Sequence, residues 1–282
     1  MKNKVLTGLL LVLIGGWGNL LAQNAGSNYA RQVNTLIGTK GVGLTSGYLY
    51  PGATYPYGMV QFTPSYFSKR SGFVINQLSG GGCEHMGNFP TFPVKGKLKM
   101  SPDNILNYRI NISEEKGHAG YYEAMVQEDI KAKLTVTERT GMASYEYPAD
   151  QQYGTVIIGG GISATPIEQA AIVITAPNKC EGYAEGGNFC GLRTPYKVYF
   201  VAEFDADALE SGTWKRDELK PNTTFAEGEY SGVYFTFDVS KKKNVQYKIG
   251  VSYVSVENAR ENLKAENTGW DFLQIQNQAE SK

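Results

Sequence analysis

Apolar and polar residues alternate along much of this chain, with a period of two. The alternation is clearest over residues 131–137, 233–239 and 245–253. Because successive side chains of a strand point to opposite faces, each segment predicts a strand with one face in a core. Residues 198–202 are continuously apolar, which predicts a central strand covered on both faces.

Turn-forming clusters separate these segments at short intervals. They include Pro148–Asp150, Gly159–Gly161 and Glu227–Glu229. No run of helices alternates with the predicted strands, as a doubly wound α/β fold would require. The pattern therefore predicts a mainly β fold, an antiparallel two-sheet β-sandwich.

The period changes to about 3.6 near the end of the chain. Ser255 is a suitable helix cap, and apolar residues follow it at positions 256, 259 and 263. Trp270 and Leu273 are spaced to begin the face of a second helix. We therefore expect the sandwich over residues 23–254 and a C-terminal helical segment over 255–282.

The second predicted helix carries much apolar surface. Its apolar residues are Trp270, Phe272, Leu273 and Ile275, and little chain remains on which they could pack. A helix of this kind normally docks onto another element. We therefore expect 255–282 to be a linker towards a missing following domain, so that the chain is a fragment.

The N-terminus has the plan of a secretory signal peptide. Lys2 and Lys4 precede an apolar run over residues 5–21, and Ala22 stands before a polar segment. The run is shorter than the roughly 20 apolar residues that a membrane-spanning helix needs, so it fits an export signal better. We expect residues 1–22 to be cleaved near Ala22, giving a secreted, periplasmic or extracellular protein.

Composition excludes several other functions. The chain has 27 basic and 27 acidic residues and no basic stripe, so nucleic acid is not an expected partner. Two histidines are too few to predict a zinc site.

Cys180 and Cys190 bracket a turn-rich stretch, and we predict a disulfide between them, because a hairpin would bring them face to face.

Two segments have the composition of binding loops. The first, residues 50–66, contains the aromatic residues Tyr55, Tyr57, Phe62 and Tyr66. These side chains either stack on a sugar ring or pack a rigid turn. The second, residues 72–94, runs through three glycines into Cys83, Glu84, His85 and Asn88. It is neither a phosphate loop nor a dinucleotide fingerprint, since the required lysine and βαβ context are absent.

Eight blocks of sequence then resemble, in order, the N-terminal domain of family 92 glycoside hydrolases. They are VNTLIGT (33–39), PGATYPYGMVQFTP (51–64), GFVINQLSGGGC (72–83), GYYEAMV (120–126), KLTVTERTGMASYEYP (133–148), FCG (189–191), YFVAEFD (199–205) and VSYVSVENARENL (251–263). Together they cover nearly the whole mature chain.

The resemblance implies half of a two-domain exo-α-mannosidase. In such enzymes a β-sandwich precedes an (α/α)6 barrel, and hydrolysis inverts the anomeric centre with a glutamic acid, an aspartate and a calcium ion, all carried by the barrel. This chain is accordingly expected to hold no catalytic residue and no metal, with Ca²⁺ required by the full-length parent. Its acidic pairs Glu114–Glu115 and Glu128–Asp129 are read as surface residues. The expected partners are mannose-containing glycans and the missing catalytic domain, not a membrane.

The resemblance also places the glycine loop at the active-site crevice. The candidate sugar-binding residues are Phe62, Gln77, Ser79, Cys83, Glu84, His85 and Asn88. Residues 74–77 and Asn88 depart from the common family pattern, which puts the linkage specificity in question. His85 is either a ligand contact or a hydrogen-bonded structural residue. The expected function is an accessory domain of an α-1,2-mannosidase, inactive alone, and the alternative is a stand-alone carbohydrate-binding module.

Overall fold

The structure is a computed structural model of the 282-residue chain. It describes residues 29–39, 49–65, 72–83, 85–103 and 111–282. The predicted signal peptide lies outside the described residues.

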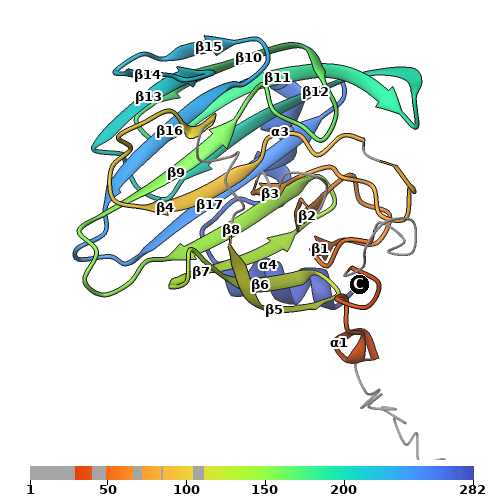
Figure 1. Cartoon of the computed structure of the whole chain (residues 1–282). Helices are drawn as coiled ribbons and strands as arrows, with labels where there is room; N and C mark the ends of the chain where they lie inside the picture. Colours follow the sequence, from red (N-terminus) through yellow and green to blue (C-terminus); the bar gives the residue numbers. More distant parts are fainter. Residues whose placement is uncertain (1–28, 40–48, 66–71, 84, 104–110) are drawn as a thin grey trace, which may run out of the picture.

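Seventeen strands of the described residues form two antiparallel sheets (Figure 1). The first contains, from edge to edge, β1 (Ala53–Thr54), β2 (Gln61–Pro64), β3 (Phe73–Val74), β4 (Thr91–Lys95), β9 (Tyr153–Gly159), β16 (Ser231–Asp238), β13 (Glu210–Lys215) and β14 (Glu218–Pro221). The second contains β15 (Phe225–Glu227), β10 (Ile167–Ala176), β11 (Lys179–Phe189), β12 (Leu192–Phe204), β17 (Asn244–Ser252), β8 (Thr140–Glu146), β7 (Ile130–Val136), β6 (Tyr121–Val126) and β5 (Ile112–His118). The described helices are α1 (Tyr29–Gln32), α3 (Val256–Glu266) and α4 (Phe272–Glu280). The predicted β-sandwich and C-terminal helices are confirmed.

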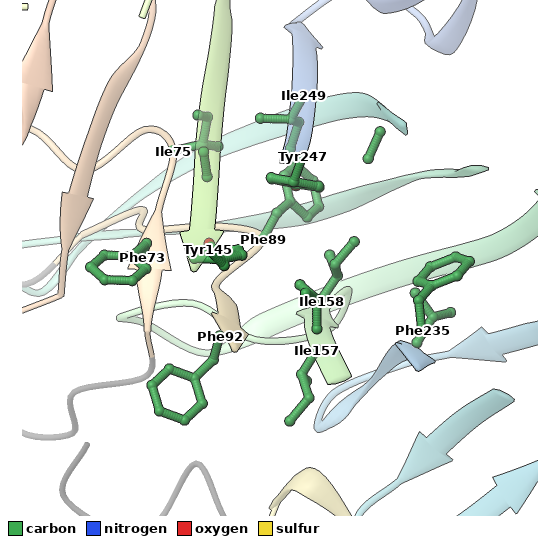
Figure 2. Packing of buried hydrophobic residues seen from close by; sticks show 14 of the residues in the cluster. Phe73, Ile75, Phe89, Phe92, Tyr145, Ile157, Ile158, Phe235, Tyr247 and Ile249 are labelled. Carbon is green, nitrogen blue, oxygen red and sulfur yellow. The ribbon is translucent and has the colours of Figure 1, made fainter. Parts of the chain in front are cut away.

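The core lies between the two sheets. Phe204 of β12 packs against Phe235 of β16, with ring centroids 4.9 Å apart. Phe73 of β3 stacks on Tyr145 of β8 at 6.2 Å (Figure 2). Full burial of such rings contributes about 1.5–3 kcal/mol each, so the aromatic residues dominate the packing.

The predicted central strand lies inside β12, between β11 and β17. Phe200 faces the inter-sheet core, where it packs against Phe89 with ring centroids 4.2 Å apart. Val201 points the other way and packs against Ala259 and Leu263 of α3. The continuous apolar run arises because the helix covers the outer face of this sheet.

Ser255 caps α3 as predicted, since its hydroxyl accepts a hydrogen bond from the Asn258 N–H at 3.0 Å. The helix lies close to the sheet at Gly250, where an added Cβ would stand 2.5 Å from the Ala259 carbonyl oxygen and 2.8 Å from the Leu263 Cβ. Glycine at this position is what permits the close approach.

Helix α4 packs on the same outer face, over β7 and β8. Phe272 and Ile275 are buried against Met142, with Tyr121 at the edge of the cluster. The expectation that these apolar residues have little to pack on is therefore wrong for Phe272 and Ile275, because Met142 and Tyr121 form an apolar patch on the outer face of the sheet. Leu273 stays exposed. None of the helices in the described ranges is long and apolar enough to cross a membrane.

Candidate functional site

Several loops meet at one end of the sandwich. The Met59 N–H donates to the Glu138 carbonyl oxygen at 2.7 Å, and the Ala164 N–H donates to that of Met86 at 2.8 Å. The Asn76 amide reaches the Tyr253 hydroxyl at 3.4 Å. We call this region, residues 49–60, 75–83, 85–90, 137–139, 160–166 and 253–255, the loop end.

Asn76 organises the loop end, although the sequence analysis did not select it as a site residue. Its Oδ1 accepts hydrogen bonds from the backbone N–H groups of Gly87 (3.1 Å) and Asn88 (2.8 Å). Its Nδ2 donates to the Asn88 Oδ1 at 3.0 Å, and Tyr196 donates to the same oxygen at 3.0 Å. Burial raises the pKa of Tyr196, which keeps its hydroxyl protonated as a donor. A buried and nearly saturated amide of this kind fixes a loop conformation.

His85 is a structural residue rather than a free ligand contact. Its Nδ1 lies 2.8 Å from the Cys83 carbonyl oxygen, and its Nε2 lies 3.2 Å from the Leu78 N–H, which donates to it. These partners assign the proton to Nδ1 and occupy both ring nitrogens. The ring is buried and packs edge-on against Phe189, with ring centroids 5.0 Å apart.

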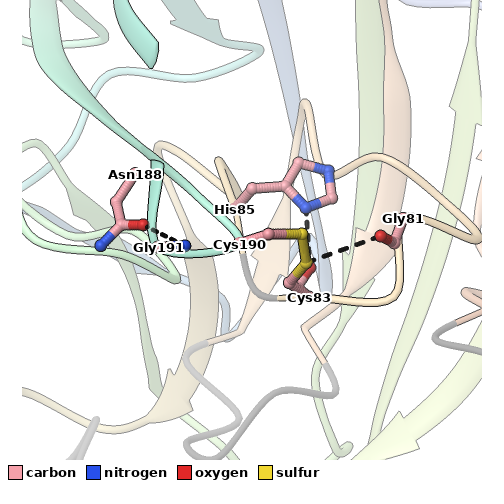
Figure 3. Close-up of a disulfide and its surroundings, with 6 residues drawn as sticks. All are labelled: Gly81, Cys83, His85, Asn188, Cys190 and Gly191. Carbon is pink, nitrogen blue, oxygen red and sulfur yellow. Dashed lines mark hydrogen bonds between the residues drawn. A yellow bond between two sulfur atoms is a disulfide. The ribbon is translucent and has the colours of Figure 1, made fainter. Parts of the chain in front are cut away.

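A disulfide joins Cys83 to Cys190, with the two Cα atoms 5.4 Å apart (Figure 3). The predicted Cys180–Cys190 bond is wrong, because the intervening residues do not turn. They form β11, so the two cysteines lie roughly 33 Å apart along one strand direction. Cys180 is buried and free. The bond instead ties the glycine loop to the tip of the β11–β12 hairpin.

Three further candidate residues are buried. Phe62 is only 1% exposed and lies in the inter-sheet core, so the prediction that it contacts sugar is wrong and the packing alternative holds. Gln77 and Asn88 are fully buried. The Gln77 side-chain amide finds no hydrogen-bond partner among the described residues. The glycine loop therefore turns Gln77 and Asn88 into the protein, not outward.

The remaining candidates differ in position. Ser79 is exposed, and its hydroxyl accepts a hydrogen bond from the Tyr50 N–H at 3.2 Å. Cys83 is half-buried in the disulfide. Glu84 and Tyr66 lie outside the described residues.

The outer surface of the loop end is formed by other side chains. Tyr57 is fully exposed at a positive φ of 57°, and Leu78, Tyr253 and Val254 are exposed on other loops of this end. An exposed group of aromatic and aliphatic residues is typical of an interaction surface.

One member of each of the two acidic pairs, Glu114–Glu115 and Glu128–Asp129, has a side-chain partner. Glu115 accepts a hydrogen bond from Tyr122 at 2.9 Å, and Asp129 pairs with Lys95 at 2.8 Å. Burial alone would raise the pKa of Glu123, but the Tyr121 hydroxyl and neighbouring ammonium groups outweigh it and lower that pKa. Among the described residues, no group of three His, Cys, Asp or Glu side chains is arranged to hold a metal ion.

One protein family matches most of this chain. The family described as glycosyl hydrolase family 92 N-terminal domain matches residues 32–252. An uncharacterized secreted glycosidase of Arthroderma benhamiae is 26% identical over 89% of this chain. The chain spans 37% of that relative's length.

Solved structures show the same fold. A family 92 glycosyl hydrolase superposes with a TM-score of 0.78 at 22% identity, over 90% of this chain and 36% of its own. A family 92 α-mannosidase from Bacteroides thetaiotaomicron gives a TM-score of 0.77 at 24% identity, over 90% and 37%. The sandwich with its two C-terminal helices thus corresponds to about a third of each of these chains.

Proposed function

Because this chain belongs to the glycosyl hydrolase family 92 N-terminal domain family, we propose that it is the accessory domain of an α-mannosidase acting on mannose-containing glycans. The match over residues 32–252 is the observation that carries the proposal. The structural relationship to an α-mannosidase supports the choice of substrate.

The loop end is proposed to form one wall of the substrate crevice and to contact the catalytic domain. Its backbone is held by the Asn76 hydrogen bonds and by the Cys83–Cys190 disulfide. Its outer surface offers Ser79 as a polar contact and Tyr57 and Tyr253 as aromatic contacts. Rigid positioning of a few exposed side chains suits a substrate-binding wall.

The catalytic groups are proposed to lie in the partner domain. Inverting hydrolysis needs a general acid and a general base, about 6.5–9.5 Å apart across the scissile bond. The general acid of such a pair has a raised pKa. The pKa values of Glu123 and Asp238 are instead lowered, that of Asp238 by its hydrogen bonds from Ser240. The described residues also do not fit a calcium site, so Ca²⁺ is assigned to the partner domain.

Export is part of the same proposal. Structural disulfides persist in oxidising compartments, and Cys83–Cys190 is such a bond. The N-terminal sequence has the plan of a signal peptide. Both observations support a periplasmic or extracellular location.

The test is hydrolysis and binding of α-1,2-linked mannobiose by the purified chain with calcium. We expect no turnover, with weak binding that shifts the NMR resonances of Leu78 and Ser79. Turnover that a chelator abolishes would contradict the accessory role. Absence of both turnover and binding at the loop end would contradict its place in the crevice.

A further inference from the structure

A hollow lies between helix α4 and the β7–β8 turn, the part of the loop end that contains residues 137–139. Its volume is about 410 Å³, within the range of roughly 300–1,000 Å³ found for small-molecule sites. Tyr55 and Arg139 line one side, and Asp271, Gln274 and Gln278 line the other. The hollow opens to solvent at Asp271, Gln274 and Gln278, which are exposed, while Ile275 lines its buried base.

One side of the hollow is rigidly built. The Glu266 carboxylate accepts hydrogen bonds from the Thr137 hydroxyl at 2.6 Å and the Arg139 N–H at 2.8 Å, and it also pairs with the Arg139 Nε. Among the described residues, no partner is found for the terminal nitrogens of that guanidinium. Tyr55 packs against the main core, which fixes its ring. The hollow thus has an aromatic surface and oriented donors beside it.

The opposite side is one face of α4. Asp271, Gln274 and Gln278 follow each other at spacings of three and four, so they share a helix face. Phe272 and Ala279 point instead towards the sheet and are buried. The helix also contains no charged residue between Asp271 and Glu280. Solvated helix faces usually carry Glu and Lys, whereas this face carries the carboxamides Gln274 and Gln278 after the N-cap Asp271, which indicates a different use.

The charges around the hollow restrict what it can bind. Three carboxylates (Glu138, Glu266 and Asp271) and two cations (Arg139 and Lys282) line it, which gives a net charge of −1. An anionic ligand is therefore disfavoured. The described residues also present no cluster suited to a metal ion. The carboxamides Gln274 and Gln278, which donate as well as accept hydrogen bonds, favour a neutral hydroxyl-bearing ligand over an organic cation.

We propose that this hollow is a second carbohydrate subsite, which binds one neutral hexose unit of a glycan. Carboxamides both donate and accept hydrogen bonds, as sugar hydroxyls do. The Tyr55 ring offers an apolar surface for the C–H face of the sugar, and the guanidinium of Arg139 offers further donors. The proposal rests on the proposed function for the choice of mannose as the sugar.

The experiment is an NMR titration of the purified chain with methyl α-mannoside. We expect saturable shifts of the Gln274 and Gln278 side-chain amides, with a Kd in the millimolar range. The double variant Gln274→Ala/Gln278→Ala should weaken this binding about tenfold, because it removes two hydrogen-bonding groups. Both positions are exposed and alanine favours helix, so the variant should fold normally.

Asn277→Ala is the matched control, since Asn277 is an exposed carboxamide of the same helix that does not line the hollow. It should leave the Kd unchanged. Absence of saturable shifts at the α4 amides, or equal binding by the double variant, would overturn the subsite. Shifts confined to Leu78 and Ser79 would also overturn it while supporting the crevice role of the loop end, so the two proposals fail separately.

Discussion

At the scale of single residues, burial separates side chains that the sequence makes look alike. Phe62 and Tyr57 come from the same aromatic segment, yet Phe62 is 1% exposed while Tyr57 is fully exposed. Phe62 packs near Tyr247, with ring centroids 6.5 Å apart. Its contribution is therefore to stability, and that of Tyr57 is to surface contacts.

We expect Phe62→Ala to lower the free energy of unfolding by about 3–5 kcal/mol, because it leaves a cavity in the core. Tyr57→Asn should change it by less than about 0.5 kcal/mol, since asparagine tolerates the positive φ and the side chain makes no buried contact. Urea denaturation measures both. A larger loss for the Tyr57 variant would contradict the assignment.

Glu123 is a carboxylate through which pH acts on the stability of the fold. Its carboxylate accepts a hydrogen bond from Tyr121 at 2.8 Å and pairs with Lys131 at 3.2 Å. These partners lower its pKa in the folded state below the ordinary value of 4.5. The ionised form therefore stabilises the fold above the unfolded-state pKa, and this contribution is lost as pH falls through the lower folded-state pKa.

We expect Glu123→Gln to cost about 1–2 kcal/mol at pH 7, and the difference from the parent chain to shrink towards pH about 3. Unfolding free energies at the two pH values measure it. Asp150→Asn, at an exposed turn, is the control and should be neutral at both. An equal cost of Glu123→Gln at both pH values would rule out the charge as its cause.

At the scale of elements, the disulfide connects two segments that the sheets do not join. It closes a sequence separation of 107 residues and joins the glycine loop to the far tip of the β11–β12 hairpin (Figure 3). Closing so long a loop restricts the unfolded chain strongly. The bond therefore stabilises the protein and positions the loop end together.

The double variant Cys83→Ser/Cys190→Ser should lose about 2–5 kcal/mol of stability under non-reducing conditions. Cys180→Ala should keep the disulfide, because Cys180 is a free core residue. Non-reducing peptide mapping by mass spectrometry identifies the linked peptides. A peptide linking residues 180 and 190 would refute this pairing.

At the scale of the whole molecule, the two C-terminal helices belong to the sandwich. They pack on the outer face of the nine-stranded sheet (Figure 1). The contacts lie at two apolar patches, around Met142 under α4 and around Val201 under α3. A helix docked in this way unfolds with the sheet beneath it.

Hydrogen exchange tests this cooperativity. We expect the amides of α4 to exchange about as slowly as those of β7, and Phe272→Ala to speed exchange in α4 through the loss of about 2–4 kcal/mol of packing. Leu273→Ala, at an exposed position of the same helix, should change little. Fast exchange of α4 in the parent chain would show instead that the helix is undocked.

The sequence alone determined the features that depend on neighbours in the chain. Alternation with a period of two located β7, β16 and β17, and Ser255 marked the start of α3. These elements follow from local side-chain direction and local hydrogen bonding, which a linear pattern records. The ordered sequence blocks likewise identified the family.

Tertiary structure decided the features that depend on residues far apart in the chain. It paired Cys83 with Cys190, buried Phe62 and Gln77, and tied both nitrogens of His85 to the backbone. It also gave α4 a surface on which to pack. Each outcome depends on which distant segments the two sheets bring into contact, and periodicity along the chain carries no information about that juxtaposition.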